Sequence, residues 1–304
     1  MKHFIDIASH SSSDIQVMLE RAQQFREGAS STCGAGETVA MIFCEDSTRT
    51  RVSFEMAAHN IGMRVIALDL SHSSLNKGET LEDTLLNLRA MGIRFFIIRH
   101  PENTAIHALA EQLSQQDIHL INAGAGMFAH PSQALLDAMT LVGHHKDLAH
   151  ARVVLLGDIR HSRVAGSLQV MMQKLACGEF IMVAPPVWQP EKVLYGRVSD
   201  SLAQSLEGAD ALIALRVQKE RICAEEQLDP ERYCAEYQLD ADSIRLGKKA
   251  MTLMHPGPVN WGVELDASLK TYPHNRILEQ VENGVYCRMT ILERLIQHSG
   301  HGHW

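Results

Sequence analysis

The sequence predicts an α/β protein with two doubly wound parallel-sheet domains, and three observations support this fold class. Short apolar segments alternate with longer stretches of helical periodicity, an order that is typical of βαβ units. The chain has 304 residues, which is long enough for two domains. Its eight candidate strands form two groups of four, which suits two sheets better than one.

Each candidate strand is a short run of apolar and β-branched residues with polar residues at its ends. The strands cover residues 38–43, 64–70, 93–99, 119–123, 152–158, 179–185, 211–216 and 249–255. Ahead of them, the helical spacing of Ile15, Met18, Leu19 and Ala22 predicts a helix over 14–25. Three serines directly before it supply a helix cap.

Two further helices are expected to join the domains. The stretch 132–142 follows His130-Pro131 and is expected to carry the chain from the first domain into the second. The last helical stretch, 285–298, is expected to pack back on the first domain. The first domain would then comprise 1–131 and 285–304, and the second domain 132–284.

The overall charge excludes several classes of function. Lys and Arg total 28 against 36 Asp and Glu, which gives a formal net charge of −8. A chain this acidic lacks the general attraction for nucleic acid or an anionic membrane, so neither partner is expected. No apolar run approaches the ~20 residues that span a bilayer, and the first residues turn polar too early for a signal peptide. An anionic ligand must therefore meet locally concentrated positive charge.

Six cysteines lie far apart in the sequence, without a Cys-x-x-Cys pair. This pattern favours reduced thiols in a cytoplasmic protein over disulfides or a zinc site. Most of the seventeen histidines are scattered singly, so no metal site is expected.

The segment 45–51, Glu-Asp-Ser-Thr-Arg-Thr-Arg, is the most specific chemical feature of the sequence. It follows a predicted strand and precedes a helical pattern. Hydroxyl groups, the free N–H groups of a helix start and guanidinium donors together suit a phosphate. The alternative is a capped helix with solvated arginines. Because two hydroxyl residues alternate with two arginines within one turn, the phosphate site is favoured.

Other polar residues follow other predicted strands, where open α/β sheets bind their ligands. Between 64–70 and the next helix, Ser74 and Lys77 lie in a segment that by spacing alone suits a surface loop. Several Arg, a Lys and two His at such positions in an acidic chain indicate a small polyanionic substrate. No P-loop, dinucleotide fingerprint or Ser-His-Asp arrangement stands out, which disfavours nucleotide-dependent and covalent catalysis. The remaining residues of this set are Arg99, His130, Gln133, Arg163, Arg216, Gln218 and the run His255-Pro256-Gly257-Pro258.

With these motifs in this order, nearly the whole chain resembles the aspartate/ornithine carbamoyltransferase family. The most specific match is the run from Ser47 to Arg51 followed by Ser53-Phe54-Glu55. The segments 130–133 and 216–218 reinforce it. The segments 76–80 and 255–258 resemble the aspartate branch, and the His-Cys-Leu-Pro motif typical of the ornithine branch does not occur.

The resemblance implies transfer of the carbamoyl group of carbamoyl phosphate to the amine of L-aspartate, an early step of pyrimidine biosynthesis. N-carbamoyl-L-aspartate and phosphate would be the products, and neither a cofactor nor a metal is implied. The first domain would bind carbamoyl phosphate and the second aspartate. Thr50, Arg99 and His130 would be the catalytic groups, acting on the carbonyl oxygen. The carbamoyl phosphate ligands would be Ser47, Thr48, Arg49, Thr50, Ser74, Lys77, Arg99, His130, Gln133, Gly257 and Pro258.

The second substrate and the assembly are also implied by the resemblance. Domain closure would pair Glu45 with Arg163 and Arg221. Since Ser74 and Lys77 would enter the site of a neighbouring subunit, the resemblance implies a homotrimer with shared active sites. Whether the trimers bind a regulatory chain or another pyrimidine enzyme stays open. The aspartate ligands would be Lys77, Arg163, Arg216 and Gln218.

Four residues depart from the family pattern at the rim of the expected pocket, where they bear on affinity: Ala125, Met127, Phe128 and Trp261. Two other functions stay open. One is a carbamoyltransferase for another amine, such as ornithine, which would need an acidic partner for its second ammonium group. The other is a catalytically silent homologue that serves as a scaffold, against which the retained phosphate ligands argue.

Overall fold

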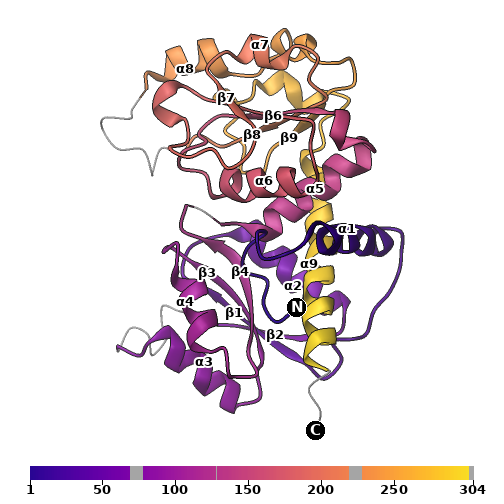
Figure 1. The fold of residues 1–304 in the computed structure, drawn as a ribbon, viewed down its shortest axis with the longest axis vertical. Coiled ribbons are helices and arrows are strands. Elements are labelled where there is room, and N and C mark those ends of the chain that lie inside the picture. The colour runs from indigo at the N-terminus through magenta and orange to yellow at the C-terminus, as the bar shows by residue number, and fades with distance from the viewer. Residues whose placement is uncertain (69–77, 128, 219–227, 301–304) are drawn as a thin grey trace. The chain divides into compact units, whose positions relative to one another are not determined.

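The chain folds into two compact units in its computed structural model. Unit 1 comprises Met1–Leu135 and Asn283–Trp304, and unit 2 comprises Leu136–Glu282 (Figure 1). Helices α5 (Pro131–His144) and α9 (Ile277–Ser299) each contain residues of both units. None of the helices in the described part of the chain is both long enough and apolar enough to cross a membrane. The structure describes residues 1–68, 78–127, 129–218 and 228–300.

Unit 1 is built on a parallel sheet with the strand order β2-β1-β3-β4. Every residue of β4 and all but the last of β3 are buried, because helices cover both faces of the sheet. Strand β2 lies at the edge and is largely exposed. The strands are β1 (Thr38–Phe43), β2 (Arg64–Ala67), β3 (Phe95–His100) and β4 (His119–Ala125).

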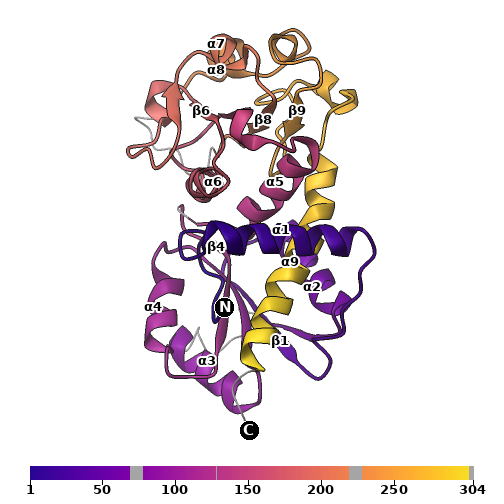
Figure 2. The ribbon, with the colours of Figure 1, turned by 45° about the vertical axis from the view of Figure 1, so that its right-hand side comes forward.

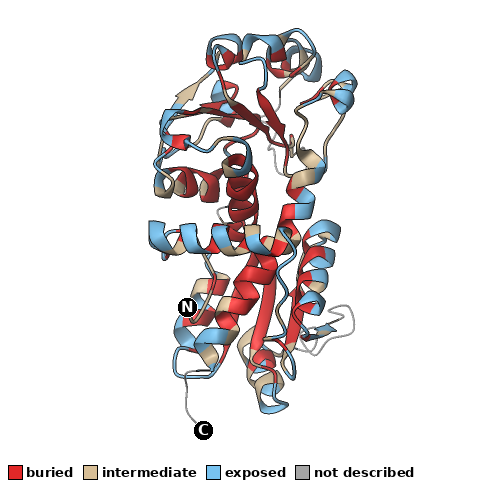
Figure 3. Ribbon diagram, turned by 90° about the vertical axis from the view of Figure 1, so that its right-hand side faces the viewer, coloured by how far each residue is buried: buried red, intermediate tan, exposed pale blue. Residues whose placement is uncertain are grey.

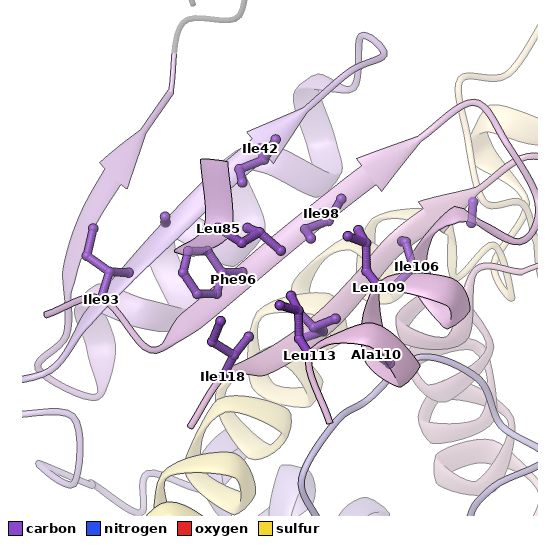
Figure 4. Close-up of a cluster of buried hydrophobic side chains, with 13 residues drawn as sticks. Ile42, Leu85, Ile93, Phe96, Ile98, Ile106, Leu109, Ala110, Leu113 and Ile118 are labelled. Carbon is purple, nitrogen blue, oxygen red and sulfur yellow. The ribbon is translucent and has the colours of Figure 1, made fainter. Parts of the chain in front are cut away.

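Helices α3 (Leu81–Ala90) and α4 (Ala105–Gln112) cover one face of this sheet. Figure 4 shows the core between them, in which Leu85 and Leu109 pack against Phe96 and Ile98 of β3. Every second residue of a strand faces the same side, so these two β3 residues share this face. The alternating strand residues therefore build one hydrophobic layer under α3 and α4.

On the other face, the unit 1 part of α9 contacts both α1 (Ser12–Arg26) and α2 (Thr48–Asn60) (Figure 2). The Arg21 side chain of α1 donates to Glu293 of α9, with 2.6 Å between Nε and Oε2. Burial alone would raise the pKa of Glu293, but this pair and a hydrogen bond from Ser31 lower it. The predicted serine cap is confirmed at Ser11, whose hydroxyl accepts from the Asp14 N–H at 3.1 Å.

Unit 2 contains a second parallel sheet, with the strand order β7-β6-β5-β8-β9. Figure 3 shows that its central strands, like those of unit 1, are buried. Helices α6 (Arg163–Lys174), α7 (Leu202–Leu206) and α8 (Pro230–Tyr237) belong to this unit. The strands are β5 (Arg152–Leu156), β6 (Glu179–Val183), β7 (Arg197–Ser199), β8 (Ala211–Ala214) and β9 (Thr252–Met254).

The prediction of four strands in each sheet is wrong for unit 2, whose described residues include the additional strand β7. This strand has three residues, two of them polar, and lies at an edge with no buried position. It is therefore too short and too polar to show strand periodicity. Helix α9 begins at Ile277, whereas the predicted helix began at 285. The prediction missed the first two turns because they are largely polar.

Phe96→Ala is expected to lower the free energy of unfolding of unit 1 by about 3–5 kcal/mol, because it leaves a cavity in the layer of Figure 4. Urea denaturation followed by circular dichroism measures the change. Met91→Ala is the matched control, since Met91 is 76% exposed and its loss costs at most about 0.5 kcal/mol. Equal destabilisation by both changes would contradict this account of the core.

Candidate active site

The connection between β1 and α2 places the predicted phosphate ligands at the carboxyl end of β1. Ser47 is the N-cap of α2, and its side chain makes no capping hydrogen bond. Thr48, Arg49 and Thr50 follow in the first turn, where backbone N–H groups have no partner within the helix. No acidic residue lies in this turn to offset the positive end of the helix dipole. We call residues 47–50 the phosphate turn, because the sequence predicts that their hydroxyl, N–H and guanidinium donors bind a phosphate.

Arg99 lies beside the phosphate turn because β1 and β3 are neighbours. Phe43 is in register with Arg99, and the Cys44 N–H donates to the Arg99 carbonyl at 2.9 Å. The Arg99 side chain is 9% exposed, with its Nε 3.5 Å from Oε2 of Glu45. Its Nη1 donates to the Ala123 carbonyl of β4 at 3.3 Å. These contacts hold a buried guanidinium at the edge of the sheet.

His130 and Gln133 follow β4, the next strand in the sheet, and both side chains are buried. The His130 carbonyl accepts from the N–H groups of Gln133 and Ala134 at 3.0 and 3.1 Å, which starts helix α5. Since β1, β3 and β4 are adjacent and parallel, their carboxyl ends bring the phosphate turn, Arg99 and His130 to one edge. This edge is the unit 1 half of the candidate site.

Arg288 of α9 is a buried cation in unit 1 that the sequence motifs did not indicate. Its guanidinium lies 4.8 Å from the centre of the Phe54 ring of α2, and its Nη2 lies 3.4 Å from the hydroxyl of Ser132. It therefore connects α9 to the helix of the phosphate turn and to the first turn of α5. The signal that marks it is one arginine between the apolar residues Cys287 and Met289.

In unit 2, a buried carboxylate organises the loop after β5. Asp158 has no exposed surface, and its Oδ1 accepts from the His161 ring at 2.7 Å and from the His161 backbone at 3.2 Å. Burial raises the pKa of Asp158, and His161 and a backbone hydrogen bond from Gln218 offset part of that rise. Asp158 thus joins the loop after β5 to the segment after β8.

The predicted second-substrate residues follow the same two strands. Arg163 is the first residue of α6, whose N-cap Ser162 accepts from the Ala165 N–H at 3.3 Å. The side-chain amide of Gln218 donates to the His161 carbonyl at 3.0 Å. Because β5 and β8 are neighbours, the structure places Arg163, Arg216 and Gln218 at one edge of the sheet.

The loop after β9 is fixed by a second buried pair. The Gly257 N–H donates to His255 Nδ1 at 2.8 Å, so this nitrogen carries no proton. The proton of the neutral ring therefore lies on Nε2, which donates to Oε1 of the fully buried Glu264 at 3.1 Å. Glu264 also accepts from the Asn260 N–H at 2.7 Å, so it holds both ends of the loop that contains Gly257 and Pro258.

Tyr233 is a further buried polar residue of unit 2. Its ring packs on Trp188 at 5.2 Å and stacks on Tyr237 at 5.7 Å. Burial, and then the charges of Glu264 and Asp158, raise the pKa of the Tyr233 hydroxyl far above its usual range. It therefore stays protonated and contributes a hydroxyl dipole near two carboxylates.

Three predicted site residues, Ser74, Lys77 and Arg221, lie outside the described residues. Where residues are described, no group of three or more His, Cys, Asp and Glu side chains has the geometry to hold a metal ion. The remaining predicted residues divide between the two halves described above.

Two protein-family models match the chain. The aspartate/ornithine carbamoyltransferase carbamoyl-P binding domain matches residues 2–143, and the Asp/Orn binding domain of the same family matches residues 149–295. The aspartate carbamoyltransferase catalytic subunit of Legionella pneumophila (strain Lens) is 46% identical over 296 residues, 97% of this chain and 99% of the relative. The protein of the same name from Stenotrophomonas maltophilia (strain R551-3) is 41% identical over 97% of this chain and 96% of its own.

Solved structures of aspartate transcarbamoylase from Trypanosoma cruzi are also similar. The complex with carbamoyl phosphate and aspartate has a TM-score of 0.84 and 28% identity, covering 96% of each chain. The complex with N-(phosphonacetyl)-L-aspartic acid has the same TM-score and identity, covering 96% of this chain and 95% of the other. The likeness therefore extends over both units.

Asp158→Ala is expected to lower the free energy of unfolding of unit 2 by about 3 kcal/mol, because it leaves the donors of His161 and Gln218 without an acceptor. Urea denaturation followed by tryptophan fluorescence measures it, since the buried Trp188 lies in this unit. Asp158→Asn keeps an acceptor oxygen and should cost less. The exposed Asp200→Ala is the matched control, and an equal midpoint for it and Asp158→Ala would contradict the role of Asp158.

Proposed function

The chain belongs to the aspartate/ornithine carbamoyltransferase family, and on this premise we propose that it is the catalytic chain of an aspartate carbamoyltransferase. It transfers the carbamoyl group of carbamoyl phosphate to the amine of L-aspartate, giving N-carbamoyl-L-aspartate and phosphate. The observation that carries the proposal is the convergence of the phosphate turn, Arg99 and His130 at one edge of the unit 1 sheet. Relatives of this name and the substrate complexes of the Trypanosoma cruzi enzyme support it.

Unit 1 binds carbamoyl phosphate. The phosphate turn, residues 47–50, receives the phosphate through its hydroxyl and N–H donors, with Arg49 and Arg99 supplying positive charge. His130, Arg99 and Thr50 donate to the carbonyl oxygen, where negative charge grows as the amine attacks. Their burial matters for this step, since a low local dielectric strengthens each hydrogen bond to the developing oxyanion. Gln133 binds the carbamoyl amide end.

Unit 2 binds aspartate. Arg163, Arg216 and Gln218 receive its two carboxylates, with Lys77 as an additional cation. Gln218 is held by Asp158 and by the His161 carbonyl, so its amide is already placed before substrate arrives. The backbone around Gly257 and Pro258, which the His255–Glu264 pair fixes, completes the carbamoyl phosphate pocket.

No side chain is assigned as a general base. Phosphate is already a good leaving group, so no protein nucleophile is required, and the departing phosphate takes the proton of the amine. Most of the acceleration then comes from orienting two anions and from stabilising the oxyanion. Glu45 stabilises the closed state by pairing with Arg163 and Arg221, in addition to its contact with Arg99.

The active enzyme is a homotrimer with shared sites, in which Ser74 and Lys77 act in the neighbouring subunit. Exposed apolar residues of unit 1 support a subunit contact here. Val52 and Met56 on α2 are 51% and 48% exposed, and Ile66 of the edge strand β2 is 42% exposed. Helix α2 contacts β2, and β2 leads directly into the segment that contains Ser74 and Lys77.

Cysteine usage supports a cytoplasmic location. Five cysteines in the described part of the chain are free thiols. Burial raises the pKa of the Cys177 thiol to about 11 and also raises the pKa of Cys44 and Cys33, so these thiols are poorly reactive. Reduced, inert thiols of this kind are typical of a reducing compartment.

Formation of carbamoyl product from carbamoyl phosphate, with L-aspartate and L-ornithine in parallel, tests the proposed function. Turnover is expected with aspartate and at least about a hundredfold less with ornithine, because the pocket lacks an assigned acidic partner for a second ammonium. Arg216→Ala should raise KM for aspartate by about tenfold or more. The exposed Arg232→Ala, on α8, is the matched control. Turnover of ornithine alone would overturn the aspartate assignment, and no turnover of either would favour a silent homologue.

Mixing two inactive variants tests the shared site. After Lys77→Ala and Arg49→Ala chains are dissociated and reassembled together, about one quarter of the sites should be intact, because each site takes these residues from different chains. The control mixture is Arg49→Ala with Arg216→Ala, whose residues come from the same chain and should give no recovery. Recovery in neither mixture would contradict a site shared through Lys77.

A further inference from the structure

The loop between β4 and α5 is a tight turn that ends at His130. Ala125 and Ala129 form an antiparallel bridge, in which the two N–H groups donate to the opposite carbonyls at 2.9 and 3.3 Å. His130 follows this bridge directly and begins the first turn of α5. The position of the His130 ring therefore depends on how this loop is held.

The loop is tied to the segment that follows β3. The Gly126 N–H donates to the His100 carbonyl at 3.0 Å, and the Met127 N–H donates to Oδ1 of Asn103 at 2.7 Å. The first bond joins two backbone groups and needs no particular side chain. The bond from Met127 needs the carboxamide of Asn103. Asn103 is half-buried and belongs to none of the motifs described in the sequence.

The carboxamide of Asn103 fits closely against the loop because Gly126 has no side chain. A Cβ at Gly126 would lie 2.6 Å from Cγ and 2.8 Å from the backbone nitrogen of Asn103. Gly126 also has a φ of +48°, a conformation that other residues rarely adopt. The loop and the Asn103 side chain therefore occupy positions that depend on each other.

From these contacts we infer that Asn103 is a positioning residue for carbamoyl transfer: its carboxamide oxygen holds the β4–α5 loop and thereby the ring of His130. The inference rests on the proposed function, in which His130 donates to the carbonyl oxygen of carbamoyl phosphate. A donor to a developing oxyanion acts mainly in the transition state, so its displacement lowers kcat more than substrate binding. In the proposed function the phosphate group is bound by the phosphate turn and Arg99, whereas the hydrogen bond of Asn103 goes to the β4–α5 loop.

Asn103→Ala is expected to lower kcat by about fivefold to tenfold, the effect of one lost hydrogen bond, with both KM values within about twofold. The unfolding midpoint should stay unchanged, since Met127 is partly exposed and water replaces the lost acceptor for its N–H. Asn103→Asp keeps an acceptor oxygen and should restore kcat to within about twofold. Wild-type kcat in Asn103→Ala, or equal losses in both variants, would overturn the inference.

A double-mutant cycle with His130→Ala shows whether Asn103 acts through His130. In the His130→Ala background, Asn103→Ala should have no further effect on kcat. The same loss in both backgrounds would overturn the inference, because Asn103 would then act by another route. A fully active His130→Ala enzyme would overturn the proposed role of His130 itself. The single variant His130→Ala thus tests that role separately from the role of Asn103.

Discussion

The common direction of the strands within each sheet is the constraint on which the candidate site depends. Parallel strands all end at one edge, so residues far apart in sequence meet there without any direct link between them. In unit 1, β1, β3 and β4 bring together the phosphate turn, Arg99 and His130. In unit 2, β5, β8 and β9 do the same for Asp158, Gln218 and His255. The strand order of each sheet therefore determines which residues meet in each half of the candidate site.

Although the chain is acidic overall, its candidate site concentrates arginines at the edges of the two sheets. Arg99 is buried, and the nearby Glu45 limits the cost of taking its charge out of water. In unit 2 the buried carboxylates Asp158 and Glu264 hold neutral or donor groups in place and do not form the binding surface themselves. The buried acidic groups thus hold the loops at the sheet edges in place.

Much of the architecture was predictable because buried parallel strands are continuous apolar runs. Strand β1 matches its predicted range, and β3, β5 and β6 lie within a few residues of theirs. Strand β7 was missed because an edge strand of three residues has no periodicity to detect. The candidate site residues of unit 1 that are described were selected by one rule, namely that polar residues directly after an apolar strand lie at the ligand edge of an open α/β sheet, and the family resemblance supplied their roles.

Residues whose role depends on distant contacts escaped the same reasoning. In the sequence, Arg288 is a single charged residue within a predicted helix. The structure shows that it lies over the Phe54 ring of α2. Glu264 and Asn103 carry no motif, and their partners, His255 and Met127, lie nine and twenty-four residues away in sequence. Such positions follow from how loops meet in space, which spacing along the chain does not encode.

Helix α9 has a consequence for how the protein is made. Unit 2 is one continuous stretch of chain, whereas unit 1 contains both Met1–Leu135 and Asn283–Trp304. A chain emerging from the ribosome therefore completes the sequence of unit 2 before that of unit 1. Until α9 arrives, Phe54 lacks its covering Arg288 and α1 lacks Glu293. The contacts of α9 with α1 and α2 therefore form only after the sequence of unit 2 has been completed.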